Sequence, residues 1–285
     1  MKKLLSLVFI SGIALGTHAQ DKKFQIGLVM GTTFNWTKVQ TTKIEKNGLG
    51  NDFIIGIGGN YMFNENVGLA SGIQFDMGSF TLNYGDDAST ALGDVFYAYK
   101  DTEIKQYKDG SVEEFTDTTA FQLMSRTYRT KYITIPLYLK FQTSMLGSFR
   151  YYGKFGARFS FLGGVRMDDT GRDADYDPTS KTFTTNTPIT GRTMTDMKPD
   201  GLKKELSPVK VGIGVSGGAE WNFTGNTFLY AELGFVYGVT PQLYPKSGVL
   251  VDKVETSTPG AYSYSNLEVK NNPQHMVELK VGLLF

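Results

Sequence analysis

Apolar and polar residues alternate along this chain in segments of ten or more residues, which is the period of a β-strand with one apolar and one polar face. In the first such segment, Phe24, Ile26 and Leu28 alternate with Gln25 and Gly27. Eight segments have this pattern, at 24–36, 52–63, 66–81, 130–142, 148–163, 208–223, 226–239 and 274–285. The pattern therefore predicts eight strands.

The charges of one segment fall in the polar phase only. In 148–163, Arg150, Lys154 and Arg158 alternate with phenylalanines and tyrosine. A soluble sandwich would bury the apolar faces in a core, whereas a barrel in lipid would turn them outward and the charges inward. The charged residues assigned to the inward face are Asp76, Lys140, Arg150, Lys154, Arg158, Lys210, Glu220, Glu232, Glu278 and Lys280.

The connections between the predicted strands alternate in length. Those at 64–65, 143–147 and 224–225 are short, and those at 37–51, 82–129, 164–207 and 240–273 are long. Short periplasmic turns and long extracellular loops alternate in this way in outer-membrane barrels. We therefore predict an all-β chain that forms a transmembrane, antiparallel, up-and-down β-barrel of about eight strands, with long extracellular loops and periplasmic termini. A membrane hairpin within 94–128 would raise the count to ten, but the charge density of that region argues against it.

Aromatic residues gather near the ends of the predicted strands, as the interfacial girdles of a membrane barrel do. Those assigned to the two girdles are Phe24, Tyr61, Phe63, Phe141, Phe149 and Trp221 on the periplasmic side and Trp36 and Tyr237 on the outer side. Pro136 interrupts its strand, and because no free edge exists in a closed barrel to accommodate its missing N–H donor, we expect a β-bulge there.

The N-terminus has the pattern of an export signal. Lys2 and Lys3 precede the apolar stretch 4–16, which is shorter than the roughly 20 residues of a spanning helix, and Thr17-His18-Ala19 offers small residues for cleavage. We assign 1–19 to a signal peptide and 20–285 to the barrel domain; an N-terminal anchor helix is the alternative. The absence of cysteine excludes a lipid-anchored cysteine, disulfides and thiolate metal sites. Loss of Lys2 and Lys3 changes the formal net charge from +1 to minus one, so nucleic acid is not an expected partner.

One segment resembles a known family. The run from Tyr132 to Phe141 (YITIPLYLKF) is similar to the Y-x-x-I-P-L-x-x-K pattern of the PorT-like outer-membrane β-barrel family of Bacteroidetes, and Ile26-Gly27-Leu28 with Phe34-Asn35 resembles that family's first strand. The resemblance implies an outer-membrane location and defines no catalytic residue. The terminal Phe285 resembles the signal read by the outer-membrane assembly machinery, so that machinery and outer-membrane lipid are the implied partners.

An eight-stranded barrel is only wide enough for side chains to fill, and buried charges persist only when paired. The mixed signs of the inward charges therefore favour a filled interior over a conducting pore. His275 lacks a serine two residues further on, so no hydrolytic site is assigned. Asp173, Asp175 and Asp177 could offer oxygens to calcium, but the glycine and glutamate of an EF-hand loop are missing and a solvated loop is favoured. We assign no cofactor, metal or catalytic residue.

The sequence thus predicts a non-enzymatic, surface-displayed barrel whose loops at 82–129, 164–207 and 240–273 have structural or binding roles. An extracellular or secretion-system protein is a candidate partner for these loops. Within these loops, 108–111 carries the signal of a two-residue hairpin, and 179–195 is polar and rich in threonine. The alternatives are a transport or secretion component, a lipid-modifying barrel enzyme and a soluble lipocalin-like binder.

Overall fold

The computed structural model describes residues 23–38, 44–84, 94–101, 103–108, 111–112, 119–185, 191–197, 205–245, 248–270 and 272–285. Every regular element in these ranges is a β-strand, and all strand pairs are antiparallel. The described ranges contain no helix long and apolar enough to cross a membrane. The signal peptide predicted at 1–19 lies outside the described residues.

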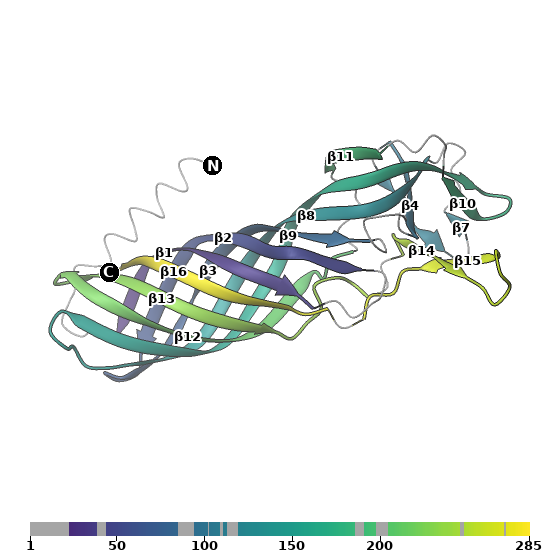
Figure 1. Ribbon diagram of the computed structural model, residues 1–285. Helices are drawn as coiled ribbons and strands as arrows, with labels where there is room; N and C mark the ends of the chain where they lie inside the picture. Colours follow the sequence, from purple (N-terminus) through teal and green to yellow (C-terminus); the bar gives the residue numbers. More distant parts are fainter. Residues whose placement is uncertain are drawn as a thin grey trace.

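Eight strands close into a ring, which confirms the predicted fold (Figure 1). In their order around the ring they are β1 (Phe24–Thr37), β2 (Glu45–Met62), β3 (Val67–Asn83), β8 (Thr119–Gln142), β9 (Phe149–Asp177), β12 (Val209–Thr224), β13 (Thr227–Gly238) and β16 (Gln274–Leu284). The last of these, β16, pairs with β1. The ring leaves no exposed strand edge in its wall, so its backbone groups are paired without help from solvent.

The pairing register fixes the shape of the barrel. The chain of paired residues that starts at Asn35 in β1 passes through Met276, Val236, Gly214, Gly156, Tyr138, Ala70 and Asn60 and returns to β1 at Gln25, ten residues lower. A stagger of this size in eight strands requires a tilt of roughly 43° from the barrel axis, within the range typical of closed barrels. The tilt is visible in Figure 1.

The two ends of the barrel differ. The end that carries the three short connections, 63–66, 143–148 and 225–226, is called the turn end here, and the opposite end is called the loop end. Between the ends, every ring strand exposes alternating apolar residues on the outside of the barrel, including Ile57, Phe75, Leu137, Phe155 and Val215. This apolar belt is the surface that the alternation predicts.

Pro136 does not produce the expected bulge. The β3–β8 ladder stops at Ser71–Leu137 and resumes at Gln74–Thr134 in unchanged register, so no extra residue is inserted. The Ser71 hydroxyl donates to the Pro136 carbonyl oxygen at 2.8 Å. The missing N–H therefore leaves a local gap in the ladder and does not change the pairing register.

Strands β8 and β9 are much longer than the sequence pattern predicts. They pair with each other well beyond the belt, up to Ala120 and Ala174, with shifts of register between Leu123 and Ser125 and between Lys131 and Tyr132. Above the belt, the outward face meets water and the inward face buries polar groups such as Arg126. Simple apolar–polar alternation therefore ends where the belt ends, although the strands continue.

The long connections expected to be loops contain further strands at the loop end. These are β4 (Val95–Lys100), β5 (Glu103–Ile104), β6 (Tyr107–Lys108), β7 (Ser111–Val112), β10 (Thr182–Thr185), β11 (Gly191–Met197), β14 (Val251–Glu255) and β15 (Tyr262–Asn266). The hairpin predicted at 108–111 is the β6–β7 pair. Strand β4 pairs with β8 and β14, β10 and β11 pair with β9, and β14 pairs with β15. We call these strands, with the upper parts of β8 and β9 and the described connections beside them, the extension; it lies at the right of Figure 1.

Candidate functional site

All ten predicted inward charges lie in the barrel interior. Seven are buried, and Arg150, Lys154 and Lys210 are half-buried. The structure adds Asp52, also buried, which precedes the first apolar residue of its predicted strand and has the same phase as Gly56. Its position in the polar phase of the alternation could have identified Asp52 as an inward residue from the sequence.

Near the turn end, Glu220 is the centre of the charge network. Its carboxylate accepts from the Nζ of Lys140 and from the Nε of Arg150, the latter at 2.8 Å. One strand further on, Glu232 accepts from the Nζ of Lys154 at 2.6 Å and from the hydroxyl of Tyr152 at 3.0 Å. These bonds hold charges on β8, β9, β12 and β13 across the lumen.

At mid-height, Arg158 joins two carboxylates. Its guanidinium donates to Asp76 at 2.5 Å and forms an ion pair with Glu278. Lys280 donates to the same Glu278 at 2.5 Å. The interior thus contains cations and carboxylates that are paired with each other, as buried charges require.

Toward the loop end, the interior is polar but carries fewer ion pairs. Lys210 donates to the Oε1 of Gln274 at 2.9 Å and lies 3.8 Å from the centre of the Tyr132 ring. The Asp52 carboxylate accepts from the Asn35 amide at 3.0 Å. Asn35 in turn accepts from Gln274 at 2.9 Å.

Little free space remains inside the barrel. A cavity of about 40 Å³ is lined by residues that include Gly58, Tyr138, Lys154 and Glu232. A second cavity, of about 20 Å³, is lined in part by Arg158 and Lys210. Because a single water needs roughly 10–15 Å³, these cavities hold a few small molecules at most.

The eight predicted girdle aromatics are placed at the two edges of the belt. Phe24, Tyr61, Phe63, Phe141, Phe149 and Trp221 are exposed at the turn end, where Phe149 stacks on Trp221 with ring centroids 6.4 Å apart. At the loop end, the ring centroids of Trp36 and Phe235 are 6.1 Å apart, and those of Tyr237 and His275 are 4.5 Å apart. Their contact with the membrane interface stays a prediction.

The extension contains a buried ionic cluster that the sequence analysis missed. Arg126 has no exposed side-chain surface, donates to both oxygens of Asp169 at 2.7 Å, and donates to both oxygens of Glu205 at 2.6 and 2.7 Å. Asp169 also accepts from the Tyr97 hydroxyl at 2.7 Å. Arg126 therefore ties together β8, β9, β4 and the connection before β12, and we call these four residues with Tyr128 and Tyr84 the Arg126 cluster.

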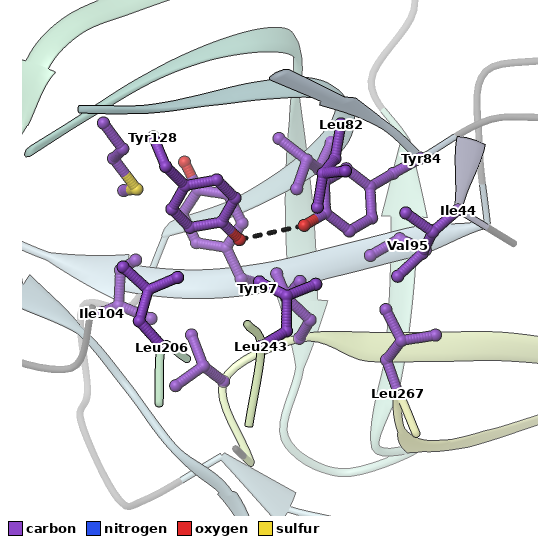
Figure 2. Packing of buried hydrophobic residues seen from close by; sticks show 14 of the residues in the cluster. Ile44, Leu82, Tyr84, Val95, Tyr97, Ile104, Tyr128, Leu206, Leu243 and Leu267 are labelled. Carbon is purple, nitrogen blue, oxygen red and sulfur yellow. Dashed lines mark hydrogen bonds between the residues drawn. The ribbon is translucent and has the colours of Figure 1, made fainter. Parts of the chain in front are cut away.

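Two tyrosines complete this cluster. Tyr128 donates its single proton to Glu205 at 2.5 Å, so Tyr84, 2.9 Å away, must donate to the Tyr128 oxygen. Burial raises the pKa of Tyr84, and the Glu205 charge raises it further, so this hydroxyl keeps its proton at neutral pH. Figure 2 shows the two tyrosines meeting among buried aliphatic side chains.

The extension has a hydrophobic core of its own. Its larger part, shown in Figure 2, collects residues from several separate connections, among them Ile44, Val95, Leu206, Leu243 and Leu267. A second part contains Phe96 and Phe183, whose rings stack 5.2 Å apart, packed beside Tyr264. The loops predicted to be exposed thus fold together into a packed unit.

The acidic run at 168–177 is occupied by partners from the chain. Asp168 accepts from Arg129 at 2.8 Å, Asp173 lies 3.3 Å from Arg192, and Asp177 accepts from the Ser180 hydroxyl at 2.6 Å. Within the described ranges, no group of three or more histidines, cysteines or carboxylates could hold a metal ion. At the other end of the molecule, Phe285 is exposed, and its backbone N–H donates to Ile26 at 2.8 Å.

A closed ring of tilted antiparallel strands, apolar outside and charged inside, defines the class of outer-membrane β-barrels. A family model confirms this assignment: residues 18–244 match the outer membrane protein beta-barrel domain, and the chain belongs to that family. Membership places the protein in the outer membrane. No curated protein matches the chain.

Among solved structures, the chain is similar to OprG from Pseudomonas aeruginosa, at 9% identity and a TM-score of 0.42, covering 92% of this chain and 96% of that one. It is similar to Neisserial surface protein A (NspA), at 12% identity and a TM-score of 0.34, with the same two shares covered. It is also similar to Ail, the attachment invasion locus protein of Yersinia pestis, at 12% identity and a TM-score of 0.32, covering 92% and 99%.

Proposed function

We propose that this protein is a non-enzymatic outer-membrane barrel with a filled, non-conducting interior that holds the extension outside the cell as a rigid binding surface. The observation that carries the proposal is the packed core of the extension, locked to β8 and β9 through the Arg126 cluster. A loop that only closed the barrel would not need a core. A preformed surface loses little conformational entropy on binding, which favours recognition of a partner.

The filled interior supports the non-conducting part of the proposal. Five of the six interior cations form ion pairs with carboxylates inside the barrel, and the two cavities are too small for a continuous water path. The refolded protein in planar bilayers is therefore expected to give no steady conductance steps. Regular steps would instead support the alternative of a transport or secretion component, to which the PorT-like segment at 132–141 also points.

The orientation can be tested because the chain lacks cysteine. Tyr262→Cys places one thiol at an exposed position of the extension, and Ser148→Cys places one at the turn end. On intact cells, a membrane-impermeant maleimide is expected to label only the first variant, whereas both should react after lysis. Labelling of Ser148→Cys alone would place the extension in the periplasm and refute surface display.

The binding role needs a separate experiment. We expect the partner to be a protein on the cell surface or of a secretion system, and we expect replacement of residues 251–266, the β14–β15 hairpin, by a short linker to abolish complementation of a deletion strain. The same replacement should leave the heat-dependent gel mobility of the barrel unchanged. Full complementation by the shortened protein would contradict a binding role for this hairpin.

A further inference from the structure

The outer wall of the barrel changes from apolar to basic where β8 and β9 leave the belt. On β8, the outward residues Ile135 and Ile133 belong to the belt, and the next two outward residues above them are Lys131 and Arg129. On β9, Arg166 is the pairing partner of Arg129. All three cations are exposed, and we call them the basic rim.

The basic rim carries more charge than the carboxylates beside it balance. Arg129 donates to Asp168 at 2.8 Å and to Asp196 at 2.9 Å, and Arg166 pairs with the same Asp196. Within the described ranges, the Lys131 side chain forms no ion pair. Three cations thus face two carboxylates, and the surplus positive charge lies at the position nearest to the belt.

The two arginines also keep donors that no described residue accepts. Arg129 uses only its Nη2 atom and Arg166 only its Nη1 atom, although each guanidinium carries five N–H groups. Because Arg129 and Arg166 face each other on paired strands, their like charges repel unless anions lie beside them. Their ion pairs with Asp168 and Asp196 are exposed and therefore weak, so a further anion can share these guanidinium groups.

The approach to Lys131 is open. Its pairing partners are Met77 on β3 and Gly164 on β9, neither of which is charged. A Cβ placed on Gly164 would meet no atom within 4 Å, so no side chain at this position covers the ammonium group. Directly below, Ile133 pairs with Phe161, and both side chains are exposed apolar surface of the belt. A ligand that carries both an anionic group and acyl chains can therefore contact the basic rim and the belt together.

We propose that the basic rim binds the phosphate group of a membrane lipid whose acyl chains lie on the belt residues of β8 and β9. Arginine binds phosphate through paired N–H donors, and basic residues next to a membrane attract anionic headgroups. Because acyl chains cover Ile133 and Phe161 in a membrane, a lipid holds its phosphate near the rim at a high effective concentration, an advantage that inorganic phosphate lacks. The lipid belongs to the outer leaflet when the extension lies outside the cell, and this choice of leaflet rests on the proposed function.

The test compares phosphatidic acid with diacylglycerol of the same acyl chains, which lacks only the phosphate. Native mass spectrometry of the full protein, purified from membranes in detergent, measures the fraction of protein that carries each lipid. Phosphatidic acid is expected to bind more tightly, by roughly fivefold for each rim cation that contacts its phosphate. Equal binding of the two lipids would overturn the proposal, as would displacement of phosphatidic acid by an equal concentration of inorganic phosphate.

Three variants locate the effect. Lys131→Gln removes a cation without a described ion pair, so the barrel should fold normally while the affinity for phosphatidic acid falls roughly fivefold; Lys131→Arg should keep the affinity. Lys181→Gln removes an exposed lysine beside β10, at the far end of the extension, and should leave binding unchanged (Figure 1).

Two results would refute the site. An equal loss of affinity in Lys131→Gln and Lys181→Gln would show general charge attraction, and full affinity in Lys131→Gln would show that the rim does not bind the phosphate. Because the assay is made in detergent, its outcome does not depend on which way the barrel is inserted, and the maleimide labelling described above tests that orientation separately.

Discussion

Replacement of Arg126 by methionine should open the extension while leaving the barrel closed. Methionine keeps the apolar length of the side chain but removes the four hydrogen bonds that hold Asp169 and Glu205. Both carboxylates stay buried without a cation, and breaking a buried ion pair in this way costs about 3–5 kcal/mol. The strand pairing of the barrel ring does not depend on Arg126, so the substitution lowers the stability of the extension and leaves that of the ring unchanged.

Hydrogen exchange measures this loss directly. If exchange in β4 and β14 proceeds through opening of the extension, an opening free energy lower by about 3–5 kcal/mol accelerates it by roughly two to three and a half orders of magnitude. Exchange in β1, β2 and β16 should be unchanged. The matched control is Arg129→Met, three residues along the same strand, where the side chain is 42% exposed and pairs with Asp168 and Asp196. Exposed pairs contribute about 0–1 kcal/mol, so this control should change exchange by less than tenfold. Equal protection of Arg126→Met and Arg129→Met would refute the role assigned to the Arg126 cluster.

Three further predictions concern the barrel itself. Glu220→Gln leaves Lys140 and Arg150 without their carboxylate. The temperature at which the barrel unfolds, measured by heat-dependent gel mobility, should therefore fall by an amount corresponding to about 3–5 kcal/mol. Glu65→Gln, at an exposed turn, should leave this temperature unchanged. Gly282→Ala would direct a Cβ into the Leu28 carbonyl oxygen and the Tyr230 ring, so it should destabilise the barrel by about 1–3 kcal/mol in denaturant titrations, and a midpoint equal to that of the unaltered protein would contradict the packing described here. Phe285→Ala removes an exposed side chain, so refolding in detergent should be nearly normal. The amount of folded protein in the outer membrane of cells should nevertheless fall several-fold. Equal amounts of folded variant and unaltered protein in the outer membrane would refute an assembly signal at this residue.

The sequence alone determined the barrel. In lipid, each wall strand must present apolar residues outward at every second position, and this constraint leaves a period of two that can be read along the chain. It located all eight ring strands to within a few residues at their turn ends and assigned the inward phase of residues such as Arg158 and Glu278. It could not show which charge pairs with which, because partners such as Arg158 and Asp76 lie on different strands and meet only when the ring is closed.

Only the tertiary structure decided the form of the extension. Above the belt, β8 and β9 have water on one face and a mixed polar and apolar packing layer on the other, so their sequence has no simple alternation. The core there joins residues as far apart in the sequence as Ile44 and Leu267, and the sequence around either residue does not indicate that the two pack in the same core. Arg126, Asp169 and Glu205 lie in segments predicted to be loops, and their burial depends on contacts between the connections 82–129 and 164–207. The membrane imposes a periodic constraint that a sequence displays, whereas the packing of loops on one another depends on contacts that only the folded chain creates.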